Sequence, residues 1–357
     1  MSDHRAARPP LPAHLLPPAY PTHCWYVAAT SDEVTAAPLA RRALDTSLVL
    51  WRTADGTAVA LEDRDAHSAY PLSRGRVHED LIVSSYSGFA YAADGACVRV
   101  PTQTEVPYGA RVRAFPVTEQ DGWVWVWFAE PGLARLRTPP RTPWLADPAW
   151  STLGDQWTTG ANVELLHENF ADITHVAVVD PDLAPPVLSA GPVPLLEVEV
   201  TETTVSFRRD YPAAPLAPWH AELLDSDPER AYVQREEGRF VSPGLWVDSW
   251  VVARDPDPDA VFRFTHAVTP VDATATRHVW RVSRTFALGE QTSGQLLPRF
   301  AAYYRAVRDI LETMQQVLSA DGPRPDVSVA ADAAALQVRR IVARMVADER
   351  RSGRGGS

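Results

Sequence analysis

Short apolar runs separated by turn signals dominate residues 24–131, and this pattern constrains the fold most. The pair Asp55-Gly56 stands between two β-prone runs, which is a hairpin signal because both residue types tolerate the backbone angles of a tight turn. Further along, large aromatic rings alternate with valine, as on a strand with one bulky face. These rings belong to Trp123, Trp125 and Trp127. The pattern predicts a small all-β domain.

A proline-rich joint over residues 138–148 precedes a second domain of mixed character. A helical pattern over 163–179 is followed by a proline-rich loop, then by strand-like runs, and two helices close the chain. The runs cover residues 195–208, 245–254, 261–268 and 277–285, and the closing helices are expected near 298–320 and 331–349. We therefore predict an extended arm over 1–20, a β domain over 21–137 and an α+β domain over 149–350, with a polar frayed tail from residue 350.

Charge and composition exclude several functional classes. The net charge of −11 and the pI near 5.4 disfavour a nucleic-acid partner, which needs clustered cationic surface. All 34 basic side chains are arginine, so chemistry that requires a lysine is excluded. Cys24 and Cys97 allow at most one disulfide and cannot form a four-thiolate metal site. No signal peptide or membrane anchor is recognisable, and a cytoplasmic location is expected.

Two loops within residues 62–91 carry the first functional pattern. They read Asp65-Ala-His67 and, after a gap, Ser84-Ser-Tyr-Ser87. The frame resembles the Cys-x-His and Cys-x-x-His loops of a Rieske iron–sulfur domain, yet only His67 stands where that domain has a ligand. Hydroxyls and a carboxylate are poor ligands for a soft cluster, so none is expected. We expect Asp65 and His67 to form a hydrogen-bonded pair that ties the loops together.

The second pattern lies at the start of the larger domain and reads Glu-Asn169-Phe170-Ala-Asp172-Ile-Thr-His175, followed by Asp180. It resembles the iron-binding segment of Rieske-type non-haem iron oxygenases of the vanillate and dicamba O-demethylase kind. There the second histidine would stand at position 180. The third ligand of that family would fall on a valine, at position 307. Five of the seven ligand positions implied by the resemblance are thus changed, and no metal or other cofactor is expected.

The resemblance implies a fold and a set of site residues. The fold is an N-terminal Rieske-like all-β domain with a C-terminal helix-grip, START-like antiparallel sheet covered by helices. Polar residues recur at helical spacing from Glu164 to His175, so they are expected to share one face. A proton relay is expected of His175, Asp172 and Asp180, the alternative being a leftover polar cluster satisfied by water. Contacts with the substrate are expected from Asn169, Phe170, Trp246, Trp250, His266 and Trp280.

Loss of both centres favours a metal-independent enzyme that catalyses a non-redox step, such as cyclisation, isomerisation or pericyclic closure, on an apolar natural-product substrate. Two alternatives stay open: a silent partner or binding subunit of an intact oxygenase, and a residual non-haem iron monooxygenase. The expected partners are an apolar small molecule and further copies of the chain, for which the family's head-to-tail trimer is the precedent. Neither nucleic acid nor a membrane is expected. The arginine, alanine and proline bias resembles that of actinobacterial proteins.

Overall fold

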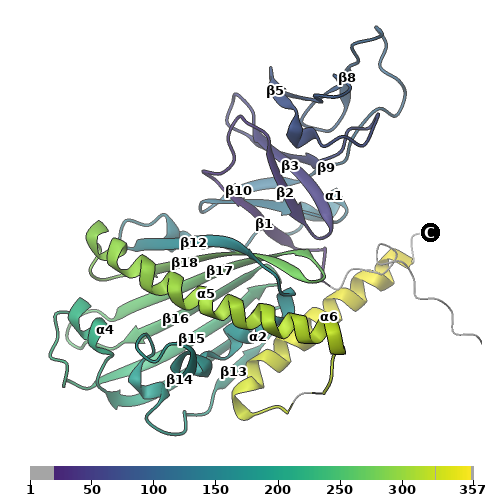
Figure 1. The fold of residues 1–357 in the computed structure, drawn as a ribbon. Helices are drawn as coiled ribbons and strands as arrows, with labels where there is room; N and C mark the ends of the chain where they lie inside the picture. Colours follow the sequence, from purple (N-terminus) through teal and green to yellow (C-terminus); the bar gives the residue numbers. More distant parts are fainter. Residues whose placement is uncertain (1–19, 326, 355–357) are drawn as a thin grey trace, which may run out of the picture.

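The computed structural model describes residues 20–325 and 327–354, so most of the arm predicted over 1–20 lies outside the described residues. Three small antiparallel sheets form the N-terminal domain (Figure 1). Their strands are β1 (Trp25–Thr30), β11 (Trp123–Trp127) and β10 (Val117–Gln120); β2 (Leu39–Ala43), β3 (Thr46–Arg52), β4 (Ala58–Glu62) and β9 (Ala114–Phe115); and β5 (Arg76–His78), β6 (Leu81–Val83), β7 (Ala90–Tyr91) and β8 (Cys97–Arg99). The predicted hairpin joins β3 to β4, where Gly56 has a φ of +88°.

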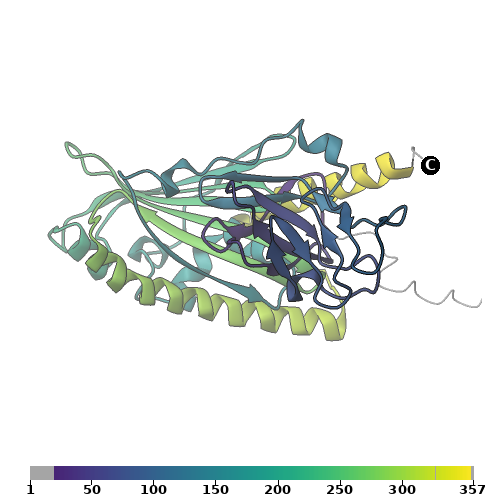
Figure 2. The same cartoon turned by 90° about the horizontal axis from the view of Figure 1, so that it is seen from above.

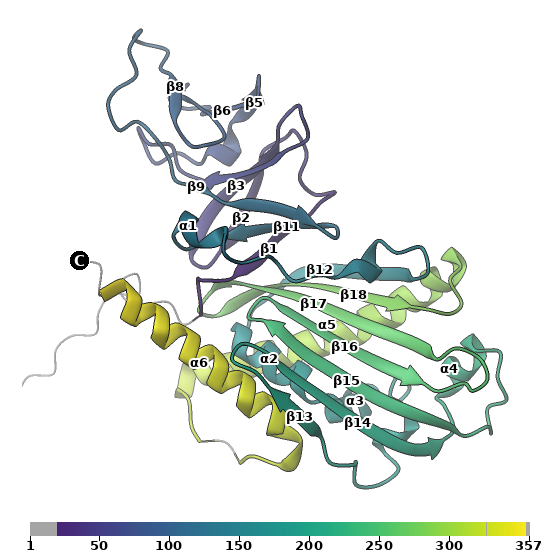
Figure 3. The same ribbon diagram turned by 180° about the vertical axis from the view of Figure 1, so that it is seen from behind.

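A seven-stranded antiparallel sheet forms the C-terminal domain, in the order β12-β18-β17-β16-β15-β14-β13. Its strands are β12 (Ser151–Thr159), β13 (Glu197–Val200), β14 (Val205–Ala214), β15 (Tyr232–Ser242), β16 (Leu245–Val252), β17 (Ala260–Asp272) and β18 (Ala275–Arg284). The helices are α2 (Val163–Ala171), α3 (Val176–Val179), α4 (Pro218–Leu223), α5 (Glu290–Asp321) and α6 (Ala333–Arg354), and α1 (Pro131–Ala134) closes the N-terminal domain. Helix α5 runs along the length of the sheet, and α6 crosses beside β13 and β14 (Figures 2 and 3).

The helix predicted over 163–179 is broken in two. Helix α2 ends at Ala171, and Asp172 has extended backbone angles, φ −143° and ψ 110°. The Asp172 carboxylate then caps a 3₁₀ turn over Ile173–His175 by accepting from the backbone N–H and the hydroxyl of Thr174, at 2.9 and 2.8 Å. The expected single polar face from residue 164 to 175 is therefore wrong, because the turn rotates His175 away from the axis of α2.

The closing helices are longer than predicted. Helix α5 begins at Glu290 and contains Pro298, the residue at which the predicted helix began. Helix α6 continues to Arg354, so the part of the predicted tail that the structure describes is helical; residues 355–357 lie outside it. Within residues 20–325 and 327–354, no helix combines the length and apolarity needed to cross a bilayer.

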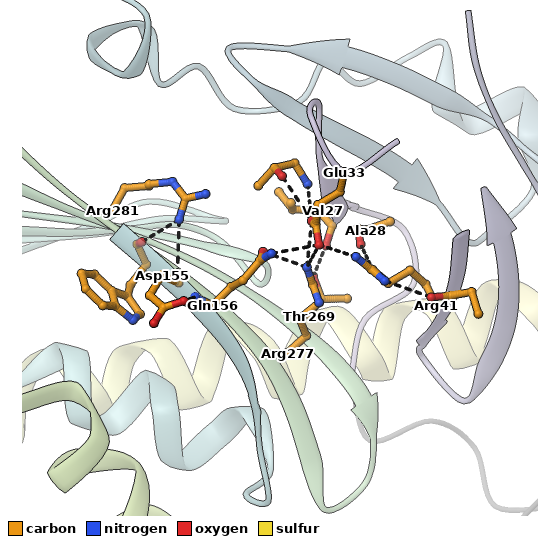
Figure 4. Close-up of polar contacts among 12 residues, drawn as sticks. Val27, Ala28, Glu33, Arg41, Asp155, Gln156, Thr269, Arg277 and Arg281 are labelled. Atoms are coloured by element: carbon orange, nitrogen blue, oxygen red, sulfur yellow. Dashed lines mark hydrogen bonds and ion pairs between the residues drawn. The ribbon is translucent and has the colours of Figure 1, made fainter. Parts of the chain in front are cut away.

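The outer face of the large sheet packs against the N-terminal domain (Figure 1). Trp25, Trp123, Trp125 and Trp127 form one apolar cluster with β16, β17 and β18, so the bulky strand face predicted from the sequence serves as an interdomain core. Glu33 adds a polar joint (Figure 4). Its carboxylate accepts from Arg277 at 2.9 Å and from Gln156 at 2.9 Å, both on the C-terminal domain, and from Arg41 on its own domain.

Candidate functional site

His175 is held from both ring nitrogens. Its Nδ1 lies 2.7 Å from the backbone carbonyl of Asp172, and because a carbonyl only accepts, Nδ1 carries the proton. Nε2 is then the acceptor, and it receives the Tyr303 hydroxyl at 2.9 Å and the Asn169 amide at 3.0 Å. Burial lowers the pKa of His175, against a smaller opposing effect of the Asp172 hydrogen bond. The imidazole is therefore neutral, and the lone pair of Nε2 already accepts these hydrogen bonds.

An aromatic cavity lies between the inner face of the large sheet and helices α2, α4 and α5. The cavity contains about 110 Å³ of space that the centre of a water molecule can reach, and its mouth opens to solvent. The wall is largely apolar, and its polar groups are imidazoles, one carboxyl group, tyrosine hydroxyls, tryptophan indoles and the Asn169 amide. Its aromatic part is Phe170, Trp219, Trp250, Phe262, Phe264, Phe300, Tyr303 and Tyr304.

The structure brings together some of the predicted site residues and separates others. Asn169, Phe170, His175, Trp250 and His266 line the cavity. Phe170 stacks on His266 with ring centroids 4.2 Å apart, so α2 and β17 meet at this point.

Two tryptophans expected to contact the substrate lie behind the cavity wall. The Trp246 indole donates to His167 Nδ1 at 2.8 Å, and Trp280 packs on Tyr304 with centroids 4.6 Å apart. Both side chains are fully buried and neither lines the cavity. These two residues support the wall from within the core, which corrects the expectation of direct contact.

The two aspartates of the expected proton relay are engaged elsewhere. The Asp172 carboxylate accepts from Thr174, and it is the backbone carbonyl of Asp172 that orients His175. The Asp180 carboxylate accepts from the backbone N–H of Leu183 at 3.0 Å. Neither aspartate lines the cavity. The relay predicted from the sequence therefore has no continuous hydrogen-bonded path.

Asp248 on β16 is the acidic group of the wall, and sequence reasoning missed it. Burial, reinforced by the nearby Glu236, raises the pKa of Asp248 well above its usual range. One carboxyl oxygen, Oδ2, lies 3.6 Å from His266 Nε2, and the other, Oδ1, is buried with no hydrogen-bond partner. Burial also lowers the pKa of His266 well below its ordinary value. Two uncharged polar groups thus face each other in the wall.

A buried cation lies two strands further along the inner face. Arg209 on β14 donates to Glu236 Oε2 on β15 at 2.9 Å, and the Tyr211 hydroxyl donates to the same oxygen at 2.8 Å. The Arg209 and Glu236 side chains are only 1% and 3% exposed, so this pair neutralises itself inside the core. The guanidinium is therefore committed to Glu236 and is not a free cation for a ligand.

The two N-terminal loops are tied together through the Asp65 carboxylate. It accepts from the backbone N–H of His67 at 2.9 Å, from the Tyr91 hydroxyl at 2.7 Å and from the Ser87 hydroxyl. Burial raises the pKa of Asp65, but hydrogen bonds from Ser84, Ser87 and neighbouring groups outweigh it, and the pKa is lowered. The tie predicted between Asp65 and His67 therefore runs through the backbone, while the exposed His67 ring stacks on Phe89 at 5.1 Å.

Neither set of side chains fits the metal group that the resemblance implies. A Rieske cluster needs two thiolates and two imidazoles, whereas the loops offer one imidazole, a carboxylate already in use and two hydroxyls. At the second site, His175 Nε2 is occupied by Tyr303 and Asn169, and the buried Val307 has no donor atom. Over residues 20–325 and 327–354, no three His, Cys, Asp or Glu side chains are grouped as metal ligands.

Two family models match the chain. The model of the Rieske [2Fe-2S] domain matches residues 24–116, and that of the vanillate O-demethylase oxygenase C-terminal domain matches residues 159–348. These matches confirm the family recognised from the two motifs.

Curated relatives match over most of their length. The toluene-4-sulfonate monooxygenase system iron-sulfur subunit TsaM1 of Comamonas testosteroni is 27% identical over 337 residues, covering 92% of this chain and 97% of the relative. A vanillate O-demethylase oxygenase subunit of Pseudomonas sp. is 25% identical over 360 residues, covering 92% and 96%. Among solved structures, dicamba monooxygenase bound to 3,6-dichlorosalicylic acid superposes with a TM-score of 0.85 at 27% identity, covering 92% and 98%. This superposition confirms the predicted α+β fold.

These comparisons correct the expected function. The relatives are components of redox oxygenases, named as iron–sulfur, monooxygenase or O-demethylase subunits. The expectation of a metal-independent enzyme that catalyses cyclisation, isomerisation or a pericyclic closure is therefore wrong. It rested on the changed ligand positions alone, and the family points to oxygenation instead.

Proposed function

The chain belongs to the Rieske-type oxygenases with a vanillate O-demethylase-type C-terminal domain, and from this premise we propose that it serves an oxygenase system as a small-molecule-binding subunit. It binds an apolar aromatic compound in the C-terminal cavity. The observation that carries the proposal is the cavity itself, an aromatic chamber retained beside a histidine whose lone pair is already paired.

Oxidation of the bound compound would depend on a second oxygenase subunit. The side chains at both implied centres of this chain lack the donor set for iron or for a cluster, so a family member with complete ligands would supply the electron transfer and the iron. The expected association of copies then becomes a mixed assembly of the two kinds of subunit. Co-expression with an intact oxygenase of the same organism, followed by size-exclusion chromatography with light scattering, tests this part of the proposal.

Calorimetric titration with 2,5-dichlorophenol tests the binding function. We expect saturable binding with one site per chain, and loss of that binding in Ile173→Trp, which places an indole in the cavity. Ile310→Trp is the matched control, because Ile310 is an exposed residue of α5 outside the cavity wall. Absence of binding to the wild type, or equal binding by the two variants, would contradict the proposal.

A second candidate is an oxygenase that holds its own iron, and the names of the relatives favour it. Elemental analysis and visible absorption of the same purified protein separate the two candidates. Stoichiometric iron with cluster absorption bands would establish the second candidate and overturn the first. Less than about a tenth of an equivalent of iron, together with binding of the phenol, supports the subunit role.

A further inference from the structure

Three buried polar atoms in the cavity wall have no hydrogen-bond partner within the described part of the chain, and one of them is the indole Nε1 of Trp250. The other two are Asp248 Oδ1 and Nε2 of His220, on α4. Both residues line the cavity, and their exposed fractions are 9% and 4%. A buried polar atom left unpaired is destabilising, so such atoms are either solvated or matched by a ligand. Their position in the wall marks where a polar group of a ligand would bind.

The strands beneath these residues place both of them at one aromatic floor. Asp248 is paired in register with Phe264 on β17, and His220 packs on Phe262 with ring centroids 5.2 Å apart. Phe262 and Phe264 lie two residues apart on the same face of that strand. Asp248 and His220 therefore stand beside neighbouring rings of this floor.

The wall offers a ligand no positive charge. No arginine lines the cavity, and the chain has no lysine. The nearby guanidinium of Arg209 donates to Glu236 and Tyr211 and does not line the cavity, and the imidazoles of His220 and His266 are neutral because burial lowers their pKa values. An anionic ligand would lose its hydration here without gaining a counter-ion. It would also lie beside the carboxyl group of Asp248 and near that of Glu236.

We propose that this cavity selects uncharged aromatic compounds that carry a hydrogen-bond donor, and that Asp248 determines this selectivity by accepting the donor through Oδ1. A carboxyl group has free acceptor lone pairs when ionised and retains some when protonated, so a hydroxyl or amide N–H of the ligand pairs with it in both states. The inference rests on the proposed binding function. It separates this chain from the dicamba monooxygenase relative, whose solved complex contains an acid.

Matched pairs of compounds test the charge and the donor separately in calorimetric titrations at pH 6.5, where the amide and the phenol are uncharged and the acid is ionised. For charge, we expect 2,5-dichlorobenzamide to bind at least about tenfold more tightly than 2,5-dichlorobenzoic acid, which corresponds to about 1.4 kcal/mol. For the donor, 2,5-dichlorophenol is expected to bind more tightly than 2,5-dichloroanisole, which differs by a methyl group on the oxygen. Both comparisons use the wild-type chain, so they do not depend on the folding of a variant.

The variant Asp248→Asn assigns the selectivity to its residue. It removes the carboxyl and presents amide hydrogens, so the preference for the amide over the acid should shrink at least threefold. Asp210→Asn is the matched control, because Asp210 is an exposed residue of β14 paired with Arg208. The preference of this variant for the amide over the acid should equal that of the wild type.

The outcomes distinguish this inference from the function on which it rests. Equal binding of acid and amide by the wild type, or the same preference in Asp248→Asn as in the wild type, would overturn the inference and leave the binding function standing. Failure of all four compounds to bind would overturn the binding function, and the inference with it.

Discussion

Replacing Asp65 by alanine should release the two loops at the tip of the N-terminal domain. The carboxylate is 1% exposed and accepts hydrogen bonds from His67, Tyr91 and Ser87. Hydrogen bonds to a charged acceptor contribute about 1.5 to 3 kcal/mol each. Part of this loss is recovered, because the Tyr91 hydroxyl still accepts from the backbone N–H of Ala66 at 3.1 Å and the half-buried Ser87 can turn to solvent. We expect a net local cost of about 3 to 5 kcal/mol.

Hydrogen exchange monitored by mass spectrometry is the suitable assay, because the loops belong to an apolar cluster separate from the rest of the chain and can open on their own. A cost of 3 kcal/mol raises the exchange of amides in residues 64–70 and 84–91 by about two orders of magnitude. Asp65→Asn is the matched control: the amide keeps the shape and one acceptor oxygen, and its loss should be less than half as large. Unchanged exchange in Asp65→Ala would refute the view that this carboxylate holds the loops together.

Three further predictions concern the domain joint, the acid response and the lost cluster. Glu33→Ala should lower the free energy of unfolding in urea by about 2 to 4 kcal/mol, because it leaves Arg277 without its carboxylate partner. The control Glu119→Ala removes a peripheral ion pair with Arg52 and should lower it by less than about 1 kcal/mol. Equal effects of the two substitutions would contradict the role of Glu33 between the domains. Burial lowers histidine pKa values to about 3, 4 and 3 at His167, His220 and His278. Between pH 6.5 and 4 these histidines bind protons in the unfolded chain but not in the folded one, so the free energy of unfolding should fall with falling pH, by up to about 1.4 kcal/mol per pH unit for each histidine. Asp248 has the opposite effect, because its raised pKa keeps one proton on the folded chain. Equal free energies of unfolding in urea at pH 7 and pH 5.5 would refute this prediction. The combined substitutions Asp65→Cys, Ser84→Cys and Ser87→His should complete a ligand set with His67, and the variant should show the absorption bands of a cluster after reconstitution with iron and sulfide. A colourless variant that is fully folded by circular dichroism would contradict the assignment of these loops.

The sequence predicted the parts of the fold that follow simple periodicity. Alternating tryptophan and valine identified β11, and long apolar runs identified β16, β17 and β18. Strand β15 escaped notice because its inward positions include Gln234 and Glu236, and the burial of Glu236 depends on Arg209, a residue of β14. Strand β12 has few apolar residues, and its pairing with β18 supplies its stability instead. The strand conformation of such segments depends on residues distant in the sequence, so the local sequence pattern does not indicate it.

The candidate site was predicted in position more than in detail. The motif around Asn169 and His175 placed the right segment at the cavity. The break after Ala171 was not foreseen, since an aspartate at helical spacing reads as part of the helix until its carboxylate is seen to cap the next turn. Asp248 was missed because it lies inside a strand-like run rich in apolar residues. A single carboxyl in such a run is a signal that a polar group is needed inside, and it could have identified this residue.

The tryptophan cluster between the domains limits which parts of such a chain can be lost during evolution. The same sheet that forms the cavity on one face exposes Leu245, Ala267 and Val279 on the other, and the N-terminal domain covers them. A C-terminal domain released from its neighbour would expose this apolar face and aggregate. The C-terminal domain is therefore not inherited alone. The N-terminal domain is retained as a cover for the apolar face of the sheet, whether or not its loops hold a cluster.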